Sequence, residues 1–140
     1  MKVLDLKGKP RDVVLGKYRV DWDGECRSKF QYNVKQFFRK YWEHHICAEE
    51  LRIPGTLLSC DFLNFTLKIS VESHGMHHES FSANKFFHGN SRAKFLRGLK
   101  NDLIKREWLE KNGFLIMEIY ENEIDLLNPK WIKDKFDVEL

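Results

Sequence analysis

Two acidic residues stand within otherwise apolar stretches of the sequence: Asp61 within residues 57–65 and Glu72 at the end of residues 67–72. A charged side chain is costly to bury in such a stretch unless it is paired or binds a metal ion. If the two stretches form neighbouring strands, the two carboxylates lie together. Two carboxylates with water and phosphate oxygens suit Mg²⁺, or Mn²⁺ in its place. A strand face turned to solvent, where acidic residues are ordinary, is the alternative.

Histidines gather directly after Glu72. His74 shares a strand face with Glu72, because side chains alternate with period two, so it is placed to exchange a proton or to bind phosphate beside a metal ion. His78 is a candidate general acid or base, because an imidazole titrates near neutral pH. A structural zinc site is the alternative use of these nitrogens, although no cysteine is close in sequence and the spacing is not a familiar zinc pattern. Its ligands would come from His74, His77, His78 and His88.

Asp102 is the one acidic residue between Lys85 and Arg106, a stretch that contains seven basic residues. A helix docked on the sheet would direct Asp102 into the same pocket as the strand carboxylates, as a metal ligand or as a partner that orients His78. The alternative is a surface pair with Lys105 or Arg106 one turn away, which is common and weakly stabilising. The basic stretch around Asp102 predicts contact with a polyanion.

The spacing of apolar residues predicts the elements that must position these groups. Apolar positions recur every three or four residues over 25–43 and 91–112, which predicts two long helices. In the second helix, Leu96, Leu99 and Leu103 lie along one face, and Asn112 with Gly113 supplies a left-handed stop. Residues 75–90 between the sheet and this helix predict a long loop, which commonly carries function.

Shorter apolar runs predict four strands, at residues 46–53, 57–65, 67–72 and 114–120. A hairpin turn is expected near 64–66, one or two edge strands within 1–22, and a short closing helix at 129–136 that begins with Pro129. The order helix, three strands, helix, strand predicts an α/β fold with a mixed central sheet flanked by helices.

Length and composition limit the architecture to one domain over residues 1–140. It divides into an N-terminal edge segment (1–24), a core (25–120) and a C-terminal helix (121–140). The content of 42% hydrophobic and 14% aromatic residues is typical of a globular chain. Three cysteines without CxxC spacing favour buried reduced thiols, and no stretch has the length and apolarity of a membrane span. These features predict a cytoplasmic protein that does not contact membranes.

Four segments carry a resemblance to a known family: CDF at 60–62, VESHG at 71–75 with His78, ND at 101–102, and KREWLEKNGF at 105–114. They resemble the compact endonucleases related to the very-short-patch repair nuclease, in the restriction-endonuclease-like PD-(D/E)xK superfamily. Within that group the chain resembles the phage-borne EDxHD-type homing endonucleases. The resemblance covers about residues 25–120.

The resemblance implies a restriction-endonuclease-like core and places the family's functional positions on this sequence. Asp61 and Glu72 would bind the metal ion, and Asp102 would be the final aspartate of the motif. His74 would take the place of the superfamily's lysine, and His78 would be the motif histidine. The first acid of the motif has no secure counterpart: Glu25, expected on the first helix, is the candidate, with Glu49 and Glu50 as rivals.

The expected activity is Mg²⁺-dependent hydrolysis of phosphodiester bonds in double-stranded DNA, in the cytoplasm of the host if the gene is phage-encoded. The metal ion would polarise the scissile phosphate, while His78 activates water or protonates the leaving group. Basic residues would neutralise backbone phosphates. Those expected at the DNA are Lys85, Arg92, Lys94, Arg97, Lys100, Lys105 and Arg106, joined by Arg27, Lys29, Lys35, Arg39 and Lys40.

Two other functions are compatible with the sequence. A non-catalytic nucleic-acid-binding module on the same scaffold needs only the basic stretch, and its binding would be indifferent to Mg²⁺ and to Glu72. A structural or protein-interaction factor would neither bind DNA tightly nor cleave it. For the nuclease, the small size of the domain favours a homodimer or nicking by a monomer.

Overall fold

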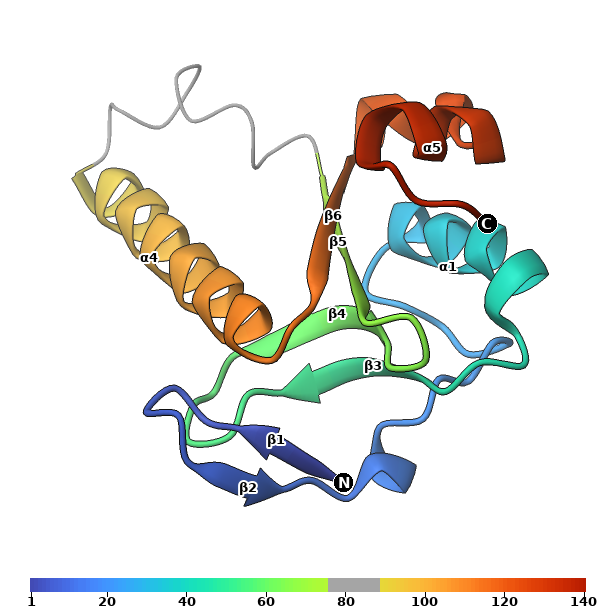
Figure 1. Cartoon of the computed structure of the whole chain (residues 1–140). Helices are drawn as coiled ribbons and strands as arrows, with labels where there is room; N and C mark the ends of the chain where they lie inside the picture. Colours follow the sequence, from blue (N-terminus) through green and yellow to red (C-terminus); the bar gives the residue numbers. More distant parts are fainter. Residues whose placement is uncertain (76–88) are drawn as a thin grey trace.

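A four-stranded mixed sheet forms the centre of the protein (Figure 1). The computed structural model describes residues 1–75 and 89–140. The strands lie in the order β3 (Cys47–Arg52), β4 (Ser59–Asn64), β5 (Ile69–His74) and β6 (Leu115–Tyr120). Strands β3, β4 and β5 are antiparallel to one another, whereas β6 is parallel to β5, which requires a crossover connection between these two strands. The predicted α/β class with a mixed sheet is confirmed.

In the part of the chain that the structure describes, three α-helices and a small ribbon surround this sheet (Figure 1). The helices are α1 (Lys29–Trp42), α4 (Gly89–Lys111) and α5 (Pro129–Phe136). The ribbon consists of β1 (Lys2–Leu4) and β2 (Pro10–Asp12), and short 3₁₀ helices occur at η1 (Leu15–Lys17) and η2 (Glu121–Leu126). The predicted edge strands therefore form a separate two-stranded sheet, and beyond it residues 13–24 add one isolated bridge, between Arg19 and Ala48.

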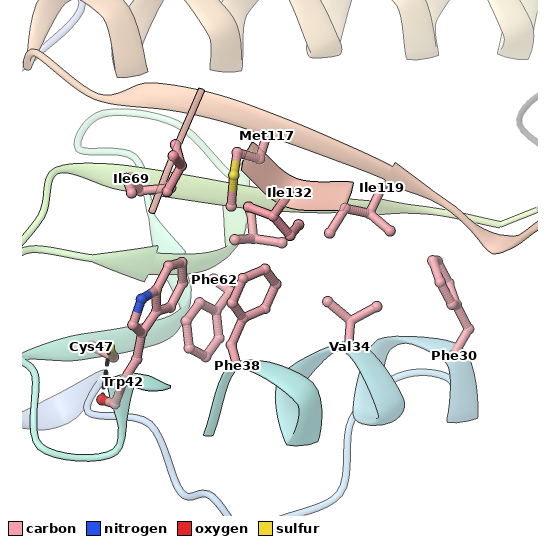
Figure 2. Close-up of a cluster of buried hydrophobic side chains, with 12 residues drawn as sticks. Phe30, Val34, Phe38, Trp42, Cys47, Phe62, Ile69, Met117, Ile119 and Ile132 are labelled. Carbon is pink, nitrogen blue, oxygen red and sulfur yellow. Dashed lines mark hydrogen bonds between the residues drawn. The ribbon is translucent and has the colours of Figure 1, made fainter. Parts of the chain in front are cut away.

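One face of the sheet packs against α1 and α5. The helix α1 begins at Lys29 because the Ser28 hydroxyl accepts the N–H of Gln31 at 3.1 Å, an N-cap, so the helix is four residues shorter at this end than the predicted start at Glu25. Figure 2 shows its apolar stripe turned toward the sheet and toward Ile132 of α5. The stripe is Phe30, Val34, Phe38 and Trp42, and the rings of the last two stack at 4.3 Å.

The opposite face of the sheet packs against the last turns of α4 and the N-terminal ribbon. Trp108 and Leu109 are fully buried there, and the indole N–H of Trp108 donates to the carbonyl of Leu4 at 2.7 Å. Asn112 holds the same ribbon residue at both its N–H and its carbonyl. Gly113 then ends the helix with φ +80°, which confirms the predicted left-handed stop.

The leucine face of α4 does not dock on the sheet. Leu96, Leu99 and Leu103 are 53%, 47% and 65% exposed. The helix touches the sheet through its C-terminal turns, and its N-terminal part lies away from the sheet (Figure 1). The period of the apolar residues predicted the helix correctly, but a helix that contacts the core at one end leaves the rest of its apolar stripe in solvent.

Within residues 1–75 and 89–140, no helix combines the length and the apolarity that a membrane crossing requires. The three cysteines are free thiols: Cys47 and Cys60 are fully buried and Cys26 is half-buried. Burial raises the pKa of Cys47 to about 12, so this thiol stays protonated and inert near neutral pH.

Candidate active site

Asp61 and Glu72 lie opposite each other where β4 and β5 separate. The last paired residues of this ladder are Phe62 and Val71, and the next position along brings Asp61 beside Glu72. Directly opposed residues of an antiparallel pair share a face of the sheet. Asp61 Oδ2 accepts the backbone N–H of Ser73 at 3.0 Å, which fixes the carboxylate at this fork. The structure thus brings together the two carboxylates that the sequence singled out.

Glu72 is the most deeply buried carboxylate of this site, with the residue 7% exposed. Burial, and then the negative charge of Asp61, raise the pKa of Glu72 well above its usual range, while Lys105 opposes the shift. Its Oε1 atom is buried and has no hydrogen-bond donor among the described residues. Its Oε2 atom is 4.0 Å from Lys105 Nζ. One oxygen of this buried carboxyl group is therefore left without a hydrogen-bond donor by the described residues.

His74, on the same strand face as Glu72, is held by β6. Its Nε2 lies 3.7 Å from Glu118 Oε1, and its ring stacks on Tyr120 with centroids 5.0 Å apart. Glu118 also pairs with Arg106 Nη2 at 2.6 Å. Glu118 is opposite Glu72 in the parallel ladder, and His74 is opposite Tyr120. The imidazole thus lies beside the carboxylate pair, stacked on Tyr120 and 3.7 Å from a third carboxylate.

Glu118 was missed by sequence reasoning, although the signal was present. It is the single acidic residue in the apolar run 114–120, the same feature that identified Asp61 and Glu72 in their strands. What the sequence could not give was the neighbour of β6 in the sheet, and only that pairing places Glu118 at the site.

These groups line a cleft of about 430 Å³ between the sheet, the start of α1 and the middle of α4. Asp102 is exposed and reaches the cleft from α4, as predicted for a helix beside the sheet. The charged side chains that line it are Asp61, Glu72, Asp102, Glu118 and Glu121, together with Arg27, Lys105 and Arg106. Among the described residues, five carboxyl groups thus face three cations, a composition that favours a metal cation over a phosphate.

The three candidates for the first motif acid, Glu25, Glu49 and Glu50, line a second cavity rather than this cleft, and Asp61 lines both. Glu25 is exposed and precedes α1, so its expected place on the helix is wrong. A smaller cavity of about 130 Å³ is lined by Asp61 with Glu25, Glu49 and Glu50. Glu49 Oε2 is 3.4 Å from Lys35 Nζ. The Glu50 carboxylate accepts from Arg27, Gln31 and Ser59 at 2.9, 3.1 and 3.2 Å.

The predicted basic residues of α4 divide into two groups. Exposed side chains on α4 belong to Arg92, Lys94, Arg97 and Lys100. Lys105 and Arg106, by contrast, are engaged with Glu72 and Glu118 inside the cleft. The expectation that Lys35 faces DNA is wrong, because it is 3% exposed and donates to the carbonyls of Asp21 and Gly24.

Some predicted residues lie outside the described part of the chain: Lys85, His77, His78 and His88. Over 1–75 and 89–140, no group of three or more His, Cys, Asp or Glu side chains is arranged to hold a metal ion. Mg²⁺ does not require such a group, because it keeps several waters and is commonly held by one or two carboxylates plus substrate phosphate. The buried Oε1 of Glu72, without a donor in the described residues, fits such a ligand.

Fold and site together define an α/β protein with a paired-carboxylate cleft at the fork of two antiparallel strands. No family model, no curated protein and no solved structure matches the chain.

Proposed function

We propose that this protein is a metal-dependent DNA endonuclease with a restriction-endonuclease-like core, related to the EDxHD-type nucleases that its motifs resemble. The observation that carries the proposal is the Asp61–Glu72 pair, two carboxylates held together at a strand fork with one buried oxygen lacking a donor among the described residues. A stable fold has no need of such a pair, because like charges at short range raise the free energy of the native state.

Asp61 and Glu72 are the residues that would hold Mg²⁺ or Mn²⁺. A divalent cation in this position supplies the positive charge that polarises a phosphate oxygen and stabilises a leaving oxyanion. Asp61 is positioned by its hydrogen bond to the N–H of Ser73, and Glu72 by burial between the sheet and α4. The pair is thus preorganised before any cation or DNA arrives.

His74 is the described group best placed to hold or move a proton at this site. Its Nε2 faces Glu118, and stacking on Tyr120 fixes the plane of the ring. Glu118 would stabilise the protonated imidazole that forms when His74 accepts a proton from water. Asp102 reaches the cleft from α4 and would act as a further acidic partner there.

The exposed basic side chains of α4 would position DNA. Arg92, Lys94, Arg97 and Lys100 extend along the helix that forms one wall of the cleft. Contacts of this kind neutralise backbone phosphates and carry no sequence information by themselves.

The test is cleavage of supercoiled plasmid DNA with Mg²⁺ or Mn²⁺ against EDTA. Wild type is expected to nick or linearise the plasmid in either metal and to be inert in EDTA. Asp61→Asn and Glu72→Gln should each lose at least about 100-fold in rate, because each removes a charge that holds the cation. Glu110→Gln, an exposed site on α4, is the matched control and should cleave like wild type. Cleavage by Glu72→Gln at the wild-type rate would refute the proposal.

The second candidate is a non-catalytic DNA-binding module, which the exposed basic row on α4 favours. In that case wild type is inert on supercoiled, branched and single-stranded DNA with both metals. It binds DNA equally well with Mg²⁺ and EDTA, and Glu72→Gln leaves the affinity unchanged. Replacement of Arg97 and Lys100 by Met would weaken binding in both cases, so only the dependence on metal and on Glu72 separates the two functions.

A further inference from the structure

Lys105 lies deeper in the cleft than a residue that contacts only DNA would need to. Its side chain is 23% exposed, whereas Arg92, Lys94, Arg97 and Lys100 on the same helix are exposed to solvent. Trp108 and Leu109 follow Lys105 by three and four positions, and both are fully buried against the sheet. Positions three and four apart lie on one face of a helix. The burial of Trp108 and Leu109, which docks α4 on the sheet, therefore also directs the aliphatic stem of Lys105 toward Glu72.

The contact between Lys105 and Glu72 is an ion pair without a good hydrogen bond. The distance from Nζ to Oε2 is 4.0 Å, beyond the range of an N–H···O bond, and Oε1 has no donor in the described residues. Burial lowers the pKa of Lys105, but the charges of Glu72 and Asp61 outweigh burial and raise it. The ammonium group of Lys105 is thus held by electrostatic attraction to Glu72 and Asp61, and it partly neutralises both carboxylates.

The neighbouring cation is bound in a different way. Arg106 forms a 2.6 Å contact with Glu118, a planar guanidinium against one carboxylate. Lys105 carries a point charge on a flexible four-carbon stem, which can leave its partner without breaking a directional bond. Of the two cations, Lys105 is the one that faces the proposed metal ligands.

We propose that Lys105 is the resident counter-ion of the Asp61–Glu72 pair, which stabilises the two carboxylates in the metal-free protein and is displaced from Glu72 when a divalent cation binds. The inference rests on the proposed metal site. It assigns to Lys105 a role other than contact with DNA phosphates: it sets how tightly the site binds its cation, because the ammonium and the metal ion compete for the same carboxylate.

Lys105 therefore has opposite effects on two quantities: it raises the stability of the metal-free protein and lowers the affinity of the site for a divalent cation. Removal of the Lys105 charge leaves the two carboxylates without a cation that the described residues place beside them, so the metal-free protein is less stable. The same change removes the competitor, so a divalent cation binds more tightly. A lysine that only contacted DNA would affect neither quantity.

The test is calorimetric titration with Mn²⁺ and Mg²⁺ in the absence of DNA, combined with thermal unfolding in EDTA. Lys105→Met keeps the aliphatic stem and is expected to bind Mn²⁺ about tenfold more tightly than wild type, since a unit charge about 4 Å away is removed. Lys105→Arg retains the charge and should stay within about threefold of wild type or bind more weakly. Lys130→Met, at an exposed position on α5, makes the same change of net charge and should match wild type.

Each outcome has one meaning. If Lys105→Met binds metal no more tightly than wild type, while Asp61→Asn and Glu72→Gln abolish binding, Lys105 is not the counter-ion and the metal site stands. If wild type and Lys105→Met both fail to bind metal, or if binding survives loss of both acids, the proposed site is wrong and the inference falls with it. If Lys105→Met unfolds too readily for titration, Lys105→Gln is compared with Lys105→Arg. Lys105→Gln is then expected to bind Mn²⁺ more tightly than Lys105→Arg.

Discussion

The site depends on a small number of charged residues held at short range, and Glu72 is the one whose ionisation is most affected. Burial and the charge of Asp61 raise its pKa above the value in the unfolded chain. The native state therefore retains a proton that the unfolded chain releases, and stability falls as pH rises from the unfolded pKa of Glu72 through its folded pKa. The free energy that burial of the Glu72 carboxyl group takes from the native state therefore increases as the pH rises.

We therefore expect Glu72→Gln to be more stable than wild type in EDTA, by a few degrees in Tm, because the amide has no charge to lose. The difference should be small near pH 4 and should widen toward pH 8, since wild type loses stability over that range. Thermal unfolding at a series of pH values measures it, with Glu110→Gln as the control. A constant difference at every pH would mean that Glu72 ionises normally.

Glu118 is a second single residue whose charge bears on the site, because it faces the imidazole of His74. Glu118→Gln removes the charge that faces Nε2 and also frees Arg106. If His74 moves a proton in the reaction, kcat should fall about 10- to 100-fold with KM changed little, since DNA is still positioned by the exposed basic residues. Steady-state cleavage kinetics measure the two constants. A rise in KM at constant kcat would instead assign Glu118 to DNA binding through Arg106.

At the scale of elements, Glu50 has a conformation that an ordinary strand residue does not adopt. Its φ is +51°, in the left-handed region that favours glycine. Ala48 and Leu51, on either side, both pack on the α4 face, so the normal alternation of β3 is interrupted between them. The Glu50 carboxylate accepts from Arg27 and Gln31, which ties the start of α1 to the sheet beside Asp61.

Two substitutions at Glu50 separate the strain from these contacts. Glu50→Ala loses the contacts and keeps the unfavourable φ, whereas Glu50→Gly loses the contacts and relieves the strain. We expect the Gly variant to be more stable than the Ala variant by about 1 kcal/mol, a reversal of their usual order in a strand. Urea unfolding of both proteins measures the difference. Greater stability of the Ala variant would show that the backbone at Glu50 is not strained.

The sequence predicted elements better than it predicted their contacts. The two long helices, the four core strands and the stop at Gly113 follow from apolar period and turn chemistry, which are local properties. The docking of α4 through Trp108, with Leu96 and Leu103 left exposed, depends on where the helix meets the sheet. The start of α1 was set by one hydroxyl, that of Ser28, which the apolar period does not report.

The same distinction holds for the site. Asp61 and Glu72 were found because an acid in an apolar strand is costly and the two strands were expected to be neighbours. Glu118 carried an equal signal but lies on β6, whose partner depends on a crossover that the sequence does not specify. The difference between Lys105, inside the cleft, and Lys100, in solvent, is a matter of helix rotation against the sheet.

For the whole molecule, charge is distributed in two zones that would act on a DNA backbone in opposite directions if the proposed function holds. The exposed part of α4 carries basic side chains, while the adjoining cleft is lined by more carboxyl groups than cations among the described residues. In the proposed nuclease, a DNA backbone drawn to the helix would be repelled by the cleft until a cation is bound there. On this argument, the metal ion has a role in binding DNA as well as in cleaving it.

This distribution predicts that neutralising the acids strengthens DNA binding when metal is absent. In EDTA at low salt, the double variant Asp61→Asn with Glu72→Gln should bind a duplex several-fold more tightly than wild type, because two charges that repel phosphate are removed. In Mg²⁺ the advantage should disappear, because wild type has then bound its cation. Fluorescence anisotropy over a range of salt concentrations tests both conditions. Equal affinity of the two proteins in EDTA would mean that bound DNA does not approach the cleft, and the carboxylate pair would then have to act on a ligand other than the duplex held by α4.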